Sequence, residues 1–318
     1  MVLTAVRRVG RNVVVVLLVT LGSVALLSLA PGSTAAVILG ENATPEAVAA
    51  LNHKLGVDRP LWEQYLSWLG HALTGDLGTS PVTNQPVTDA VLARLPVTLE
   101  LAVLSLLISV VVAVVLAVVS ATWQDTVVDR AVTALSSVLL SVPAFIAGPL
   151  LVYFLALQLH WFPVSGWSRI EADGLGANLS SAIMPSLAIA LIEIAAFHRI
   201  LRSDLISTLG EDFVGAARAK GMSRMYVMFR HALRPSSFSL ITLAGINLGR
   251  LIGGTVVVET LFSLPGLGQF IVTSITARDV VTVQGIVVFI VVVYVVINML
   301  VDLSYNWLDP RVRKVAAA

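Results

Sequence analysis

The sequence predicts an all-α integral membrane protein with six transmembrane helices and both termini in the cytoplasm. Three observations lead to this fold class. Hydrophobic residues make up 57% of the 318 residues and charged residues only 12%, far from the balance of a water-soluble globular protein. The apolar residues gather in runs of about 20, which is the length of helix that spans a bilayer. Lysine and arginine concentrate in the connections on one side.

The first apolar run, residues 13–30, follows Arg7, Arg8 and Arg11. A basic flank also precedes the apolar region of a secretory signal, which is roughly 7 to 15 residues long. Because this run is longer, the sequence favours a retained transmembrane helix over a cleaved signal.

Residues 33–96 are mixed in polarity and predict short helices outside the bilayer core. Thr44-Pro45-Glu46 is typical of a helix start. Residues 58–78 carry Trp, Tyr and Leu on a segment too short and polar to span, which predicts a helix in the headgroup layer; an aromatic ligand pocket is the alternative. His53 and His71 have no metal ligand at helical spacing and are expected at the surface.

Five further apolar runs follow, at residues 97–120, 131–159, 182–201, 238–258 and 283–305. Pro143, Gly148 and Pro149 interrupt the second of these five and predict a broken helix, either as a packing kink or as the lining of a pathway. The connection before the run at 182–201 is expected to be an exposed loop. The connection after residue 258 is broken by Gly and Pro and is expected to dip back toward the membrane.

The basic residues give the orientation. Fourteen of the 20 Lys and Arg residues fall on the side that holds both termini, five fall on the other side, and Arg250 lies in a span. The fourteen are Arg7, Arg8, Arg11, Arg130, Arg199, Arg202, Arg218, Lys220, Arg224, Arg230, Arg234, Arg311, Arg313 and Lys314. Because basic connections stay in the cytoplasm, this count predicts that both termini are cytoplasmic.

The longest polar and basic interval of the C-terminal half, residues 211–237, predicts a short helix in a basic loop that covers residues 201–236. Gly210 suits the end of the preceding helix, and Glu211 and Asp212 suit the start of a new one. Lys220-Gly221 would end it, and Ser223 would cap a second helix that runs through Arg234 and is stopped by Pro235. We interpret the loop as a docking element, with a solvated basic loop as the alternative. The docking residues would be Glu211, Asp212, Phe213, Gly215, Ala216, Ala217, Arg218, Lys220 and Gly221.

At this loop the sequence resembles the membrane-spanning permease subunits of bacterial ABC importers. Their signature of Glu-Ala-Ala, three variable residues and Gly is matched by Ala216, Ala217 and Gly221, with Gly215 in place of the glutamate. The form EDFVGAARAKG, the segment 55–80, and the stretches LPVTLELA, VVVETLFSLPGLG and LDPRVR are similar to the branch that imports dipeptides, oligopeptides and nickel.

The resemblance implies a type I ABC importer permease in the bacterial cytoplasmic membrane. Residues 1–96 would hold the first helix and an extracytoplasmic segment, residues 97–310 the core permease domain with the coupling loop 201–236, and residues 311–318 a cytoplasmic tail. The chain would form half of a pore that works by alternating access. Its implied partners are a sister permease, two cytoplasmic ATPase subunits, an extracytoplasmic substrate-binding protein and the lipid bilayer. No binding to nucleic acid is expected.

The sequence assigns no catalytic or metal-binding residue to this chain. A P-loop ends in Gly-Lys-Ser/Thr, and none of the three lysines is followed by Ser or Thr. ATP and Mg are therefore expected on the partner subunits, and the chain itself would be a non-catalytic subunit. The absence of cysteine excludes disulfides and thiolate metal sites.

Glu193 lies well inside the fourth predicted span, and Arg250 lies well inside the fifth. Ionisable groups in a bilayer face the protein interior and find partners, so we expect them to pair. The alternative is that they contact the charged termini of a peptide in the pathway.

Other functions fit less well. An ion-coupled secondary transporter would need more intramembrane charge, and an intramembrane enzyme would need a catalytic constellation such as HExxH, which is absent. Short peptides are favoured over nickel as the cargo because no cluster of His or carboxylate residues lies in a predicted span.

Overall fold

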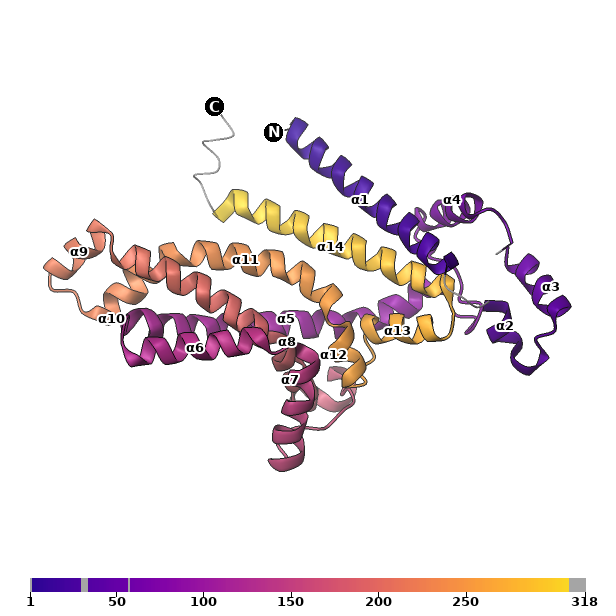
Figure 1. The fold of residues 1–318 in the computed structure, drawn as a ribbon. Helices are drawn as coiled ribbons and strands as arrows, with labels where there is room; N and C mark the ends of the chain where they lie inside the picture. Colours follow the sequence, from indigo (N-terminus) through magenta and orange to yellow (C-terminus); the bar gives the residue numbers. More distant parts are fainter. Residues whose placement is uncertain (1, 30–33, 57, 309–318) are drawn as a thin grey trace. The chain divides into compact units, whose positions relative to one another are not determined.

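The computed structural model describes residues 2–29, 34–56 and 58–308. Within these residues the chain is helical and has no strand, and extended backbone pairs at an isolated bridge between Thr79 and Pro86 (Figure 1). The expected tail at 311–318 lies outside the described residues. The chain divides into two compact units, one of Met1–Thr98, Pro265–Met299 and Leu308–Ala318, the other of Leu99–Leu264 and Leu300–Trp307.

The first unit carries helices from both ends of the chain. They are α1 (Val2–Leu29), α2 (Thr34–Leu39), a 3₁₀ turn (Gly40–Asn42), α3 (Pro45–Leu55), α4 (Leu61–Ala72), the start of α5 (Val87–Thr122), α13 (Leu267–Thr276) and most of α14 (Val280–Leu308). A cluster of buried apolar side chains forms its core: Leu77, Val87, Val91, Leu267 and Ile286.

Helix α3 begins and ends as its sequence predicts. The Thr44 Oγ1 accepts a hydrogen bond from the Ala47 N–H at 3.2 Å, and Gly56 closes the helix with a φ of 70°, a conformation that favours glycine. The aromatic segment that follows forms α4, and the Tyr65 hydroxyl lies 2.7 Å from the Thr20 hydroxyl of α1. This contact fixes the short helix against the first long one.

The second unit holds the remaining helices. They are the rest of α5, α6 (Val127–Ser141), α7 (Ala144–Leu151) with a π-helical continuation (Val152–Gln158), α8 (Ile170–Leu209), α9 (Asp212–Ala219), α10 (Arg224–Tyr226) with a π-helical continuation (Val227–Ala232), α11 (Leu233–Gly254) and α12 (Val256–Leu261). Its core is built on Phe197, Leu201 and Leu205 of α8, which pack with Ala113 and Ala117 of α5.

The predicted break in the run 131–159 is confirmed. Helices α6 and α7 meet at a bend of 105°, and Pro143 stands at the break as the residue before α7. Gly148 of α7 lets α12 approach closely, because a Cβ there would lie 3.0 Å from Leu261 Cδ2. The bend and this close approach fix the direction of α7.

Two expectations about helix ends were wrong. The segment before residue 182 is not all loop, because a first helical turn starts at Ile170, where the Asp173 carboxylate accepts the Arg169 N–H at 3.0 Å. Non-helical backbone at Gly174 (φ 80°, ψ 164°) separates this turn from the rest of α8. Pro235 does not end the helix that Ser223 starts. A π-helical turn precedes the ring, and the Ser236 and Ser237 hydroxyls donate to the carbonyls of Ala232 and Leu233 at 2.9 and 2.6 Å.

The long apolar helices correspond to part of the six expected spans. In the described residues, α5, α8 and the portion Val280–Val301 of α14 are each long and apolar enough to cross a membrane, and the bent α6–α7 pair would make a fourth span. Helices α1 and α11 coincide with the other two predicted runs. In the described residues, neither is long and apolar enough to count as a further span.

Candidate functional site: a surface loop and two charge pairs

The predicted short helix in the loop between α8 and α11 is present as α9. Glu211 precedes it in extended backbone, and Lys220 follows it. Gly221 then takes a φ of 79°, and its N–H donates to the Arg218 carbonyl at 2.9 Å while the Met222 N–H donates to the Ala217 carbonyl at 3.3 Å. These two bonds complete the end of the helix and reverse the chain.

Helix α9 has an inner and an outer face. Val214 and Ala217 are buried and pack against Val227 and Leu209, so they hold α9 onto its own loop. The other predicted docking residues are exposed: Glu211, Asp212, Phe213, Gly215, Ala216, Arg218, Lys220 and Gly221. The structure therefore separates Ala217, which supports the loop, from the residues that a partner could touch.

Large apolar side chains are also exposed on the same loop. Phe213 is 49% exposed, and the others are Met222, Met225, Tyr226 and Phe229. Beside them, Arg224 donates to the Thr122 carbonyl at the end of α5, and Arg218 and Arg224 line an open cavity of about 440 Å³. Apolar groups next to arginines are typical of a protein-binding surface.

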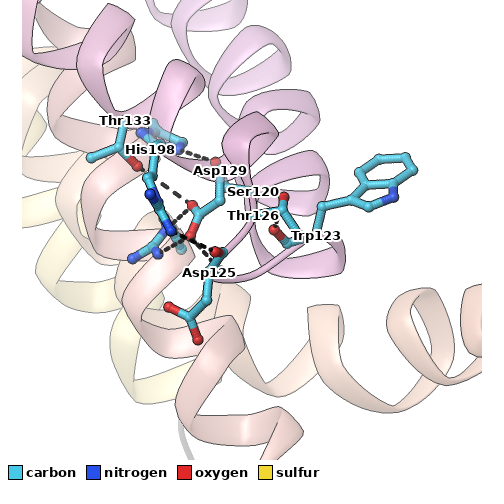
Figure 2. A network of polar contacts seen from close by, with 9 residues as sticks. Ser120, Trp123, Asp125, Thr126, Asp129, Thr133 and His198 are labelled. Atoms are coloured by element: carbon cyan, nitrogen blue, oxygen red, sulfur yellow. Dashed lines mark hydrogen bonds and ion pairs between the residues drawn. The ribbon is translucent and has the colours of Figure 1, made fainter.

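The first charge pair, Asp129 with Arg202, joins α6 to α8, and Figure 2 shows Asp129 among the polar side chains around it. Arg202 donates from Nε and Nη2 to the two oxygens of Asp129 at 2.7 and 2.6 Å, in the bidentate arrangement that makes such pairs strong. The Asp125 N–H also donates to Asp129, at 3.1 Å. The carboxylate is buried, and an open cavity of about 470 Å³ lies beside the pair, lined by Arg130, Thr133 and Ser137 among others.

One turn before Arg202, the His198 ring connects three helices. Its Nε2 lies 3.1 Å from the Ser120 Oγ of α5, and its Nδ1 lies 2.8 Å from the Ser136 Oγ of α6. Since a hydroxyl can donate or accept, both ring nitrogens of a neutral imidazole are satisfied. His198 is only 1% exposed, and with Arg202 it ties α5, α6 and α8 together.

The second charge pair joins α8 to α11. The Arg250 guanidinium donates to the Glu193 carboxylate, whose other oxygen accepts a hydrogen bond from Asn247 at 2.6 Å. The structure thus brings together the two ionisable residues that the sequence placed in separate spans. The Glu193 side chain is 5% exposed, whereas the Arg250 side chain is 63% exposed.

Sequence reasoning missed His198, Asp129 and Asn247. A signal for the first was present, because a histidine in an apolar run needs polar neighbours. Asp129 was read as part of a polar turn, and nothing in the sequence connected it with Arg202 far along the chain. Within the described residues no group of three or more His, Asp or Glu side chains is placed to hold a metal ion.

Comparisons with known proteins identify the family. A family model described as "Binding-protein-dependent transport system inner membrane component" matches residues 109–314, and a model of the N-terminal region of such components matches residues 1–102. A crystal structure of an amino acid ABC transporter shares the fold, with a TM-score of 0.52 at 17% identity over 69% of this chain and 94% of that one.

Relatives at higher identity cover nearly the whole chain. The "Probable peptide ABC transporter permease protein y4tP" of Sinorhizobium fredii is 38% identical over 96% of this chain and 98% of its own length. The di/tripeptide permease protein DppB of Pseudomonas aeruginosa is 32% identical over 96% and 97%. The dipeptide permease protein DppB of Lactococcus lactis is 35% identical over 85% and 86%. The chain therefore belongs to the binding-protein-dependent inner membrane components, the permease subunits of ABC importers.

Proposed function

We propose that this permease forms half of the translocation pore for short peptides and is driven by cytoplasmic ATPase subunits that dock on α9. The observation that carries the docking role is the two-sided construction of α9, with Val214 and Ala217 packed inward and Phe213 and Ala216 exposed. The peptide cargo is supported by relatives that are named for peptides and dipeptides. ATP and Mg would be bound by the partners, and this chain would have no catalytic role.

The proposed topology has six spans with both termini in the cytoplasm of a bacterial cell. The 28-residue α1 and the 22-residue α11 would supply the spans beyond α5, α6–α7, α8 and α14, since at about 1.5 Å per residue each can cross roughly 30 Å. The distribution of Lys and Arg supports the orientation. We propose a division of the chain between residues 96 and 97; of the two family models, one ends at residue 102 and the other begins at residue 109.

The construction of α9 suggests how force would reach the spans. A partner that pulls on the exposed face moves the whole helix, because Val214 and Ala217 are packed against Val227 and Leu209. Leu209 is the last residue of α8, and Val227 begins the turn that leads into α11. Movement of the ATPases would therefore pass to α8 and α11 together, which is the coupling that alternating access needs.

The test is affinity purification of the tagged chain from mild detergent, with identification of the proteins that accompany it. We expect a second permease and ATPase subunits. Ala216→Arg, on the outer face, should lose the ATPases while keeping the sister permease. Ala217→Arg is the comparison: an arginine cannot fit against Val227, so this variant should disturb the loop itself and increase its proteolysis.

Two results would contradict the proposal. If the unmodified chain purified alone and transported without ATP, an ion-coupled carrier would be the better description. If Ala216→Arg and Phe213→Asp both retained the ATPases in normal amounts, α9 would not be the docking element. Competition of labelled dipeptide uptake by unlabelled peptides or by nickel distinguishes the two cargo classes.

A further inference from the structure

Glu193 is held too firmly to meet a solute itself. Both of its carboxylate oxygens accept hydrogen bonds from side chains of α11, one from Arg250 and the other from Asn247 at 2.6 Å. Glu193 and Asn247 are both buried. The carboxylate therefore works as an anchor that fixes the position of the arginine.

Arg250 has donors to spare. A guanidinium carries five N–H donors, and the contact with Glu193 uses one edge of it. The side chain is 63% exposed in this chain. In a membrane helix, an exposed charge faces a water-filled space or another protein, because lipid cannot solvate it. The outer edge of the guanidinium is thus directed away from lipid.

The helix face beside Arg250 is open. Gly253 and Gly254 follow it by three and four residues, so they share its face. Both are exposed, and a Cβ added at either would meet nothing within 4 Å. A solute group could therefore approach the backbone next to the guanidinium without steric hindrance.

We propose that Arg250, positioned by Glu193 and Asn247, is a specificity-determining residue of the translocation pathway and receives the carboxylate of a passing peptide. This inference rests on the proposed peptide permease function. Arginine matches a carboxylate through two parallel N–H donors, whereas it repels a divalent cation such as nickel. Because Glu193 already neutralises much of its charge, the contact is weak enough for the solute to leave again, as a conduit requires.

The test uses the assembled importer with its binding protein in proteoliposomes, and compares Arg250→Gln, Arg250→Lys and the control Arg199→Gln, which alters an exposed arginine of α8. Three quantities are measured: association with the partners, ATPase stimulation by peptide-loaded binding protein, and peptide uptake. The glutamine amide can still donate to Glu193, so Arg250→Gln should assemble and hydrolyse ATP. Its uptake should fall by about tenfold, the loss expected for a charge-assisted hydrogen bond. Arg250→Lys should recover most of the uptake, and Arg199→Gln should match the unmodified protein.

A second comparison separates carboxylate recognition from a structural pair. The uptake ratio of a free dipeptide to the same dipeptide with an amidated C-terminus is measured in each variant with one binding protein, so that the preference of the binding protein cancels. The ratio should fall in Arg250→Gln. The double variant Glu193→Arg/Arg250→Glu keeps a pair but presents a carboxylate outward; it should assemble without recovering uptake.

Three results would overturn the inference: normal uptake by Arg250→Gln, full recovery of uptake by the double variant, or loss of the sister permease from Arg250→Gln, which would make the arginine an interface residue. If the unmodified importer itself shows no ATP-dependent peptide uptake, the proposed peptide permease function is wrong. Failure of the inference about Arg250 alone would leave uptake by the unmodified importer intact.

Discussion

Helix α8 carries two ion pairs that are built in opposite ways. Asp129–Arg202 is bidentate, at 2.6 and 2.7 Å, and the arginine side chain is only 26% exposed. Glu193–Arg250 uses one arginine donor and leaves that side chain 63% exposed. Arg202 uses two guanidinium donors to bind Asp129, whereas Arg250 uses one donor for Glu193 and keeps the others for a group outside this chain. An enclosed pair holds helices together, and an open pair presents a charge.

The surroundings of the two pairs reinforce this difference. The enclosed pair lies one turn from His198, whose ring contacts Ser120 and Ser136, so that α5, α6 and α8 are joined at two levels. In the open pair, Asn247 donates a hydrogen bond to Glu193. The exposed Gly253 and Gly254 share the helix face of Arg250. We therefore expect changes at the first pair to lower stability and changes at the second to alter transport.

Asp129→Asn should give the largest loss of stability. It leaves Arg202 without its carboxylate, and removing one partner of a buried pair costs about 3 kcal/mol. Unfolding of the purified permease in denaturant measures this loss. Asp125→Asn is the matched control, because Asp125 is exposed and its hydrogen bond to Asp129 comes from the backbone N–H, which the substitution keeps. Equal stability of the two variants would show that the enclosed pair does not hold the helices.

His198→Ala should have the next largest effect. It removes contacts to two hydroxyls and leaves a cavity, at a cost of about 2 kcal/mol in the free energy of unfolding. Ser136→Ala, which removes one of these contacts, should cost about half as much. Ser137→Ala should be neutral, since the Ser137 side chain is exposed and its hydroxyl donates to the Thr133 carbonyl of its own helix. If Ser136→Ala and Ser137→Ala had the same free energy of unfolding, the contact between His198 and Ser136 would not hold the helices together.

Lysine replacements sharpen the comparison between the two arginines. Arg202→Lys cannot reproduce the bidentate bond to Asp129 and should lose about 1 kcal/mol of stability. Arg250→Lys keeps a cation at the open position and should leave the unfolding midpoint nearly unchanged. Thermal unfolding of both variants under one condition checks this. If Arg250→Lys were less stable than Arg202→Lys, the burial of a pair would not predict how much that pair stabilises the fold.

The smallest effect is expected at a third pair, His53–Asp58, which is exposed on both sides. The hydrogen bond from His53, at 2.7 Å, holds the pKa of the Asp58 carboxyl below its usual value. A lowered carboxyl pKa stabilises the folded state above the unfolded-state pKa, and this contribution disappears as the pH falls through the folded-state value. Because solvent screens the pair, His53→Ala should melt like the unmodified protein at pH 7 and at about pH 3. A clear difference confined to pH 7 would contradict this view of exposed pairs.

Residues close in the sequence determined much of this molecule before any contact was known. Thr44 and Gly56 fix the ends of α3, Gly221 ends α9, and Pro143 marks the bend between α6 and α7, because caps, turns and proline breaks depend on a few neighbouring residues. The apolar runs and the motifs of the 211–221 loop are also made of residues close in the sequence, so the sequence alone indicated a membrane permease. The expected pairing of Glu193 with Arg250 followed from the high cost of burying a lone charge.

Only the tertiary structure decided which groups from distant segments meet. It brought Asp129 to Arg202 and Ser120 to His198, turned Ala217 inward and Ala216 outward on one short helix, and left Arg250 open while Arg202 is enclosed. Helical periodicity shows that two residues share a face, but which face is covered depends on the packing of other helices. That packing is a property of the whole chain, because each buried face is chosen by the surfaces available to cover it.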